Sequence, residues 1–464
     1  MARLVISALL LLSVPALASS HVYSLTALVH KVKQDYPAVE AARHSLSAAE
    51  AQVSQASRLR LPTGELTFGL TGSPSVRCTD SSGTIPANQA AREMNCIDTS
   101  VNDLNHQGGI DALPIHGAAF RLELKLAQPL FTFGKIDSAR SLARSGRDVA
   151  SEQIHLAEAT AVENATRAYW GLRGARTAAA TIEDAKHHLG DWVRKIDADM
   201  DRGKSTFTET DLIRLKLSLE TAELLLLDMR RNEEVALAAV RTLTGDPEAD
   251  VDANDVEAVE VALKPVGFYE DAARLHRPEA RMLNAAKSAA AANRSLKLAE
   301  LLPDIGLVGS FAYGFAQGVD DPVNAFVNHP NTLSLGLYLA IRQPLDFGPR
   351  LGRLTQAKAE ERQLEAKRRE ALGGIALEID RAYAATKEAL KRSERTEHGE
   401  KLALGWFRSV DDNMKLGIGD SRDLADAARN YFELRLRHLQ SMIDFNIAVA
   451  ALQRAAGIDL SPSN

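Results

Sequence analysis

Few residues in this chain have types and spacing that could do chemistry, and the clearest are two aspartates, Asp423 and Asp426. Their i, i+3 spacing places both carboxylates on one face of a predicted helix. Carboxylates gathered on one surface attract cations and repel each other. A simpler interpretation is also open, because acidic side chains in the first turn of a helix are stabilised by the helix dipole.

The sequence shows no Ser/His/Asp or Cys/His arrangement for nucleophilic catalysis and no spacing typical of a metal site. The run Gly417-Ile418-Gly419 lacks the preceding strand and the loop of a phosphate-binding motif. We therefore expect no catalytic residue, no metal and no cofactor. An exported metal-dependent enzyme would need a ligand cluster that this sequence does not offer.

Residues 1–18 have the pattern of a secretory signal peptide. Arg3 supplies the positive end, Leu4 to Leu12 the apolar core, and Ala16-Leu17-Ala18 a cleavage site with small residues. No cysteine follows the cleavage site, so we expect no lipid anchor on Ser19. Beyond it, no apolar run approaches the roughly 20 residues of a membrane-spanning helix. We expect a mature chain that is exported and soluble, or that crosses a membrane as strands.

The two cysteines, Cys78 and Cys96, lie in one predicted loop. A cysteine pair in an exported chain is typical of a disulfide, which we expect here. The alternative is a metal site completed by His106, His116 or Met94, but this spacing matches no familiar ligand pattern.

The charge balance argues against one class of partner. The chain has 55 basic and 61 acidic residues, a net charge of −6, and therefore no basic surface for nucleic acid. Aromatic residues make up only 5% of the sequence, which favours long, close-packed helices.

The elements that position these residues are predicted twice along the chain. Tyr36-Pro37 is echoed by Arg277-Pro278, and Gln128-Pro129 by Gln343-Pro344. Such a duplication is a property of the fold. We predict a first repeat at 19–245, an acidic linker at 246–276 and a second repeat at 277–464. The linker is interpreted either as solvated chain or as part of a collar around the helices.

Alternating apolar and polar residues predict four strands, at about 64–72, 119–128, 305–316 and 332–343. Phe120, Leu122 and Leu124, for example, alternate with Arg121 and Glu123. The strands have the length that a tilted strand needs to cross a bilayer. A soluble sheet packed on helices is the alternative.

Helices are predicted at 24–60, 135–200, 211–244, 350–414 and 423–456. Apolar residues at steps of three and four, such as Leu212, Leu215 and Leu219, indicate coiled coils, and Glu233 breaks this stripe. A helix over 135–200 would be about 100 Å long and could not lie inside a globular domain. We expect Tyr169 and Trp170 to pack, and His187 and His188 to be solvated.

Four strands cannot enclose a pore, because the smallest membrane barrels have about eight. Their open edges would leave N–H and C=O groups unpaired in lipid. We therefore expect identical chains to share one barrel.

The chain resembles the TolC-type outer-membrane efflux proteins of Gram-negative bacteria. The resemblance is carried by the duplication, by Leu-Pro before the first and third strands, by the Gln-Pro-Leu-Phe-Thr-Phe-Gly run at 128–134, by Gln-Pro-Leu-Asp-Phe-Gly at 343–348, and by the run from Gly417 to Ala427. It implies a mainly helical fold with membrane strands: tandem coiled-coil hairpins and four transmembrane strands per chain. Three chains would close as a homotrimer with a 12-stranded β-barrel and an α-helical tunnel through the periplasm.

The resemblance also implies roles for residues and partners. Asp423 and Asp426 would form a gate or selectivity ring, and a periplasmic adaptor and an inner-membrane pump would dock at the hairpin tips, at Gly203, Leu416, Gly417 and Ile418. The sequence departs from the family at Met414, where a tyrosine is frequent, which puts a gate-locking phenol hydrogen bond in doubt.

The expected function is a passive exit duct in the outer membrane for small toxic compounds, drugs or metal ions. A type I protein-secretion channel is the alternative that the sequence does not separate. A soluble periplasmic coiled-coil adaptor is a third interpretation, but such an adaptor would lack the four strands of bilayer length.

Overall fold

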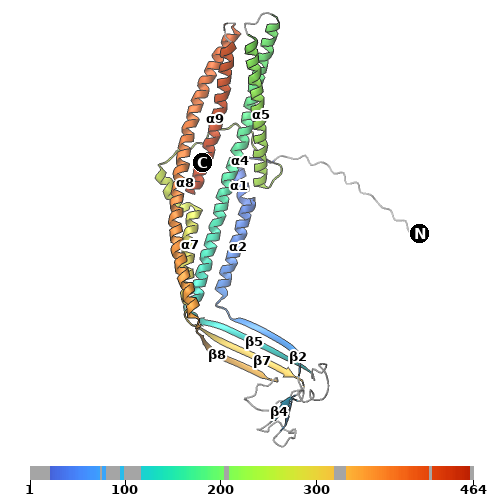
Figure 1. Cartoon of the computed structure of the whole chain (residues 1–464), viewed down its shortest axis with the longest axis vertical. Helices are drawn as coiled ribbons and strands as arrows, with labels where there is room; N and C mark the ends of the chain where they lie inside the picture. The colour runs from blue at the N-terminus through green and yellow to red at the C-terminus, as the bar shows by residue number, and fades with distance from the viewer. Residues whose placement is uncertain are drawn as a thin grey trace, which may run out of the picture. The chain divides into compact units, whose positions relative to one another are not determined.

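The computed structural model describes residues 21–73, 76–79, 95–98, 117–202, 208–317, 331–416, 418 and 421–459. These residues fall into two compact units. Unit 1 comprises the described residues within 1–49, 146–286 and 365–464, and unit 2 comprises those within 50–145 and 287–364. Each unit therefore combines segments of both sequence repeats (Figure 1).

The chain is mainly helical, as predicted. The helices are α1 Leu25–Asp35, α2 Pro37–Arg58, α4 Lys135–Asp201, α5 Glu209–Thr244, α6 Val266–His276, α7 Pro278–Ala299, α8 Phe347–Lys415 and α9 Ser421–Ala456. The strands are β1 His21–Tyr23, β2 Thr63–Gly72, β3 Val76–Thr79, β4 Asn95–Asp98, β5 Ala118–Phe131, β6 Ala249–Val251, β7 Asp304–Ala316 and β8 Leu333–Arg342. None of the described helices combines the length and apolarity that spanning a membrane requires.

The prediction of a single helix over 24–60 is wrong, because the helix is interrupted at Tyr36. Tyr36 is extended (φ −66°, ψ 127°) between α1 and α2. The ring of a proline disfavours helical backbone in the residue before it, so Pro37 ends α1 and opens α2. Arg277 before Pro278 has nearly the same backbone angles (φ −68°, ψ 127°), so the duplication extends to this break.

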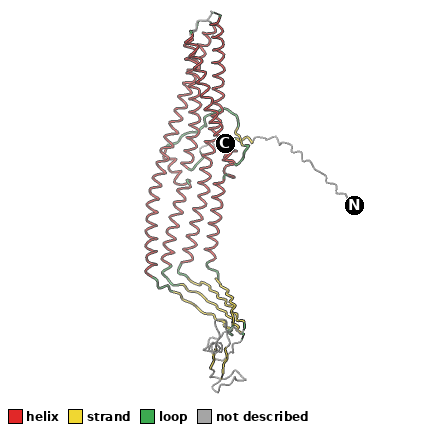
Figure 2. The backbone as a smooth tube through the Cα atoms, turned by 45° about the vertical axis from the view of Figure 1, so that its right-hand side comes forward, coloured by secondary structure: helices red, strands yellow, loops and turns green. Residues whose placement is uncertain are grey.

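The long helices of unit 1 run side by side (Figure 2). Small side chains lie at several of their contacts. Ala161, Ala165 and Leu172 of α4 are fully buried in its main core. At Gly174 an added Cβ would collide with the Ile443 side chain of α9. Close approach of helices therefore depends on alanine and glycine at these positions.

The second and shorter helix of each hairpin, α5 in the first and α9 in the second, ends in the same way. Gly245 after α5 and Gly457 after α9 both adopt left-handed backbone, with φ of 66° and 69°. Glycine accepts this conformation without a Cβ clash and closes the last helical turn.

Unit 2 contains a four-stranded antiparallel sheet in the order β2-β5-β7-β8. The register sets Phe68 opposite Leu122, Leu122 opposite Tyr313, and Tyr313 opposite Leu333. In the described part of this sheet, β2 and β8 have one neighbour each and so form its edges. Strand β5 continues past Gln128 to Phe131, with an irregular register at Pro129. A short hairpin of β3 and β4, which the sequence did not predict, lies in the long loop between β2 and β5.

Candidate functional site

The tip of the first hairpin is closed by a capping box at the start of α5. The Asp211 N–H donates to the Thr208 hydroxyl (3.3 Å), and the Thr208 N–H donates to the Asp211 carboxylate (3.1 Å). These two bonds satisfy amides that lack helical partners. Hydrogen bonds from Thr208 also lower the pKa of Asp211. Gly203, the predicted docking residue of this tip, lies outside the described residues.

The tip of the second hairpin presents apolar side chains. Leu416 is 74% exposed and Ile418 is 75% exposed. Lys415, the last residue of α8, is paired with Asp411 (2.7 Å). Gly417 lies outside the described residues. Exposed apolar side chains at the end of a hairpin are typical of a surface that binds another protein.

The aspartates Asp423 and Asp426 lie at the start of α9, directly after this tip, and both are exposed. Their neighbours Leu424 and Ala427 are buried, so the two carboxylates share the solvent face of α9. The Asn430 side chain donates to the backbone carbonyl of Asp426 (2.8 Å) and not to its carboxylate.

One face of the sheet in unit 2 is apolar, and within the described part of the chain its side chains are exposed. Leu335 is 85% exposed, Leu333 72%, and Phe68 63%. Leucine and phenylalanine side chains continue across all four strands in the observed register. A soluble sheet packed on helices would bury this face, so the alternative of a soluble sheet does not hold. A contiguous exposed apolar face of this kind marks contact with lipid or protein.

The opposite face of the sheet is polar. On β5, Glu123 pairs with Arg121 (2.5 Å) and with Lys125 (3.3 Å). Both basic side chains are mostly exposed. The strand therefore separates an apolar face from a charged face, as in a wall between lipid and water.

Known proteins share these features. The sequence profile of the family described as outer membrane efflux protein matches residues 28–246 and 271–458. The chain belongs to this family. It is an outer-membrane efflux protein, and the predicted family, function and outer-membrane location are confirmed. The fold of the single chain, long helical hairpins with a four-stranded sheet, is confirmed as well.

Solved structures share the fold. The outer-membrane channel OprN superposes with a TM-score of 0.73 at 17% identity, covering 94% of this chain and 91% of its own. The Campylobacter jejuni CmeC channel has a TM-score of 0.70 at 15% identity, with 95% and 87% covered. The Neisseria gonorrhoeae MtrE channel has 0.72 at 17%, with 94% and 89% covered. Among curated protein sequences, none matches this chain.

The efflux protein sets Cys78 of β3 opposite Cys96 of β4 in the backbone register. Opposed residues of an antiparallel pair have Cα atoms close enough for a disulfide. The disulfide stays a prediction. His106, His116 and Met94, the alternative ligands, lie outside the described residues.

Part of the acidic linker of the efflux protein packs against α4, whereas Asp255, Glu257 and Glu260 are exposed to solvent. Asp250 pairs with Arg176 (2.7 Å), and the Tyr169 hydroxyl donates to Asp252 (2.9 Å). Burial and the bond to Asp252 raise the pKa of the Tyr169 phenol, which stays a neutral donor. Strand β6 of the linker pairs in parallel with β1. Tyr169 and Trp170 are buried, as expected.

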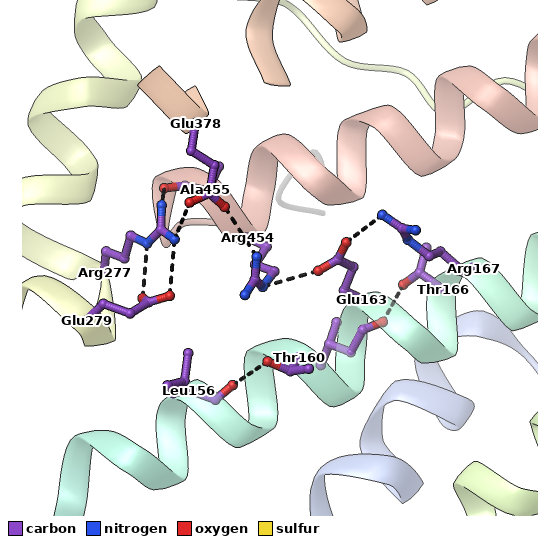
Figure 3. A network of polar contacts seen from close by, with 11 residues as sticks. Leu156, Thr160, Glu163, Thr166, Arg167, Arg277, Glu279, Glu378, Arg454 and Ala455 are labelled. Carbon is purple, nitrogen blue, oxygen red and sulfur yellow. Dashed lines mark hydrogen bonds and ion pairs between the residues drawn. The ribbon is translucent and has the colours of Figure 1, made fainter. Parts of the chain in front are cut away.

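A charged network joins both hairpins of the efflux protein (Figure 3). Arg277 donates to Glu279 (3.0 Å) and to Glu378 (2.6 Å). Arg454 of α9 pairs with Glu378 of α8 (3.3 Å) and with Glu163 of α4 (3.1 Å). Arg277 is 4% exposed, and burial of a charge requires such complete pairing. These residues are distant in sequence, so no local pattern predicts the network.

Sequence reasoning also missed an aromatic group near the tips. Trp192 of α4, Phe407 of α8 and Tyr431 of α9 form a row of neighbouring rings. Met414, the residue that replaces the frequent tyrosine, is partly buried in an apolar cluster beside this row. His187 and His188 lie on the surface, as expected, with side chains 74% and 50% exposed.

Proposed function

We propose that three copies of this efflux protein share one 12-stranded barrel in the outer membrane and continue it as a helical tunnel. The observation that carries the proposal is the uncovered apolar face of a sheet whose edge strands, β2 and β8, each have one neighbour. Lipid offers no hydrogen bonds to an open edge, so the β2 edge of one chain must meet the β8 edge of the next.

The helices of unit 1 support the same head-to-tail contact. Ion pairs tie α5 to α4 (Lys186–Glu223), and α4 to α9 (Arg435–Asp184). Polar contacts tie α9 to α8. The outer faces of α5 and α8 expose apolar side chains, with Leu217 66%, Leu224 65% and Leu402 63% exposed. A contact of α5 with α8 of the next copy covers both faces and closes a ring.

The channel is a passive duct that works with a periplasmic adaptor and an inner-membrane pump. The exposed side chains of Leu416 and Ile418 support adaptor docking at the second tip, and Gly203 and Gly417 complete the docking surface. The cargo is small toxic compounds, drugs or metal ions.

Asp423 and Asp426 form a ring at the periplasmic mouth. Three chains bring six carboxylates together, and at ~10 Å two such charges repel by about 0.4 kcal/mol in water and about 1.7 kcal/mol at an effective dielectric near 20. The ring favours cations and relaxes when a cation binds or when the hairpins separate.

Fractionation tests the assembly. The protein should enter the outer-membrane fraction, migrate as a heat-modifiable trimer and crosslink to three subunits. Purified trimers should conduct ions in planar bilayers. A soluble monomer would remove the proposal.

A further inference from the structure

A groove of about 860 Å³ runs along α4 between α5 and α9, within unit 1. Its floor on α4 is built from small residues, among them Gly171, Gly174 and Ala178. Leu225 and Met229 of α5 form one wall, and leucine and isoleucine side chains of α9 form the other. Sites that hold drug-sized molecules have volumes of about 300–1,000 Å³ and mostly apolar linings. The groove therefore has the size and the lining of a small-molecule site.

The rim of the groove is polar but offers little net charge. Asn164, Asn232 and Gln440 lie at its exposed edges. Among the described residues that line the groove, Arg167 is the one charged side chain, and it pairs with Glu163 of the same helix at 2.7 Å. A few polar groups around apolar walls can orient a ligand without requiring a charge on it. The lining therefore suits an uncharged molecule.

The floor of the groove is flat because α4 contributes glycine and alanine there. A Cβ added at Gly171 would lie 4.0 Å from the Ala236 side chain of α5, and a Cβ added at Gly174 would collide with Ile443 of α9. These glycines bring the three helices close together and leave a shallow trough between them. A flat apolar molecule, such as an aromatic ring system, makes the largest contact with a floor of this shape.

The groove and the acidic linker lie on opposite faces of α4. The Tyr169 hydroxyl donates to Asp252 of the linker (2.9 Å), and Arg173, one turn further, donates to two linker carbonyls. Gly171 follows Tyr169 by two positions and Ala178 follows it by nine. With 3.6 residues per turn, both lie about 180–200° around the helix from Tyr169. The linker therefore leaves the groove open.

In a closed ring of helices, the linker has room only on the outside. Twelve helices at a spacing of ~10 Å enclose a lumen roughly 30 Å across. The linker packs with α1 in one core, so each chain adds a second layer to this face of α4. Three such layers, each about 10 Å thick, would fill the lumen. The linker therefore lies outside the ring, and the groove on the opposite face of α4 faces the lumen.

We propose that this groove binds flat, uncharged, apolar molecules of drug size on their way through the duct. The proposal rests on the proposed function for its position in the lumen, whereas the groove itself lies within one chain. It narrows the cargo to a class that gains from leaving water, because the walls offer apolar contact and no free charge. Three chains place three such grooves at one level of the tunnel.

Photolabelling of the purified protein with 3-phenyl-3-trifluoromethyldiazirine, an uncharged aromatic compound, tests the groove. Peptide mapping by mass spectrometry should place most of the label on the groove segments of α4, α5 and α9, and excess N-phenyl-1-naphthylamine should displace it. Leu225→Glu should reduce this label several-fold, because a carboxylate beside an apolar ligand is costly. Leu225 is 43% exposed, so the charge can be solvated in the empty groove.

Leu227→Glu is the matched control, because it makes the same change on α5 at a residue that is 55% exposed and does not line the groove. Its label should equal that of the wild type. Ala239→Leu fills the groove without adding a charge and should act like Leu225→Glu. Label spread evenly over other exposed leucines, or label that both groove variants leave unchanged, would overturn the proposal. Label found in the monomer but lost in the trimer would show that a second copy covers the groove, and would also overturn it.

Currents through single trimers in planar bilayers separate the groove from the channel. N-phenyl-1-naphthylamine should reduce the current of the wild type and of Leu227→Glu, but not that of Leu225→Glu. An unchanged current through a protein whose groove is labelled would reject the position in the lumen. A conducting trimer without displaceable label would reject the groove as a binding site and leave the channel standing. Displaceable label on a protein that forms no conducting trimer would instead reject the channel and leave the binding site standing.

Discussion

At the scale of single residues, the charged side chains fall into two groups: exposed carboxylates, for which we propose a functional role, and paired charges with a structural role. Asp423 and Asp426 are exposed at the start of α9, whereas Arg277 is buried and fully paired. Glu233, which breaks the apolar stripe of α5, pairs with Arg176 of α4 at 2.8 Å. An irregular charge in a coiled-coil stripe can thus be explained by a partner on the adjacent helix.

Replacing Asp423 and Asp426 together by alanine should weaken the cation preference of the channel and its block by divalent cations. The reason is the loss of up to six negative charges from one constriction. Reversal potentials across a salt gradient measure this preference. Glu433→Ala, which removes an exposed carboxylate two turns along α9, is the control. Unchanged selectivity in the double variant would discard the carboxylate ring.

The network around Arg277 predicts a dependence of stability on pH. Burial raises the pKa of Glu279, but hydrogen bonds from Arg277 outweigh it and leave that pKa below the ordinary 4.5. A carboxylate whose pKa is lower in the folded state stabilises the fold at pH values above its ordinary pKa. This stabilisation is lost as the pH falls through the folded-state pKa. Glu279→Gln should therefore lower the Tm at neutral pH, and its difference from the wild type should shrink below about pH 4.5.

Thermal unfolding followed by circular dichroism at several pH values measures this difference. Asp271→Asn, which alters an exposed carboxylate one turn from Arg274, is the control and should have little effect at any pH. A difference for Glu279→Gln that persists or grows in acid would contradict the assignment.

At the scale of elements, the two faces of the sheet differ in polarity, and this difference sets the environment that each face requires. Alternation in β8 places Leu335 on the apolar face and Ser334 on the polar face, and both are exposed. Leu335 and Ser334 therefore differ in the environment that their face of the sheet meets and not in their exposure within one chain. The long helices follow the same logic, since their small residues allow close packing and their exposed leucines need a second chain.

Leu335→Arg should reduce the yield of folded trimer in the outer membrane, because a charge on the lipid face costs about 2–4 kcal/mol near the bilayer centre. Ser334→Arg places the same side chain one residue away on the polar face and should leave the yield unchanged. Heat-modifiable migration of membrane fractions gives the comparison. Equal yields would show that the apolar face does not meet lipid.

At the scale of the whole molecule, the described residues of one chain leave the sheet edges β2 and β8 with one neighbour each and expose apolar side chains on α5 and α8. Leu217 and Leu224 lie on α5, and Leu402 lies on α8. Assembly therefore has to supply what the single chain lacks. The energetic consequence is that trimer stability should depend on residues that a monomer leaves in water.

Leu217→Glu with Leu224→Glu should lower the proportion of trimer and leave the helix content of the monomer intact. The charges would be buried unpaired in the proposed α5–α8 contact, which is costly. Ser218→Glu on the same helix is the control. Analytical ultracentrifugation in detergent measures the oligomer, and a trimer as stable as the wild type would place the interface elsewhere.

Patterns in the sequence predicted the duplication, the long helices and the four strands with their alternating faces, and the resemblance of its motifs predicted the family. The duplication, the helices and the strands follow from local periodicity and from the spacing of prolines and glycines, which constrain the backbone within a few turns of chain. The interruption of the first helix at Tyr36 could also have been predicted from Pro37, because a proline disfavours helical backbone in the residue before it.

The folded structure was needed to establish the sheet order, the exposure of the apolar face, the packing of part of the acidic linker on α4, and the contacts of Trp192 with Phe407 and of Phe407 with Tyr431. Each joins residues far apart in sequence. Periodicity shows that a side chain faces a partner, but the partner's identity depends on register and on which helices become neighbours.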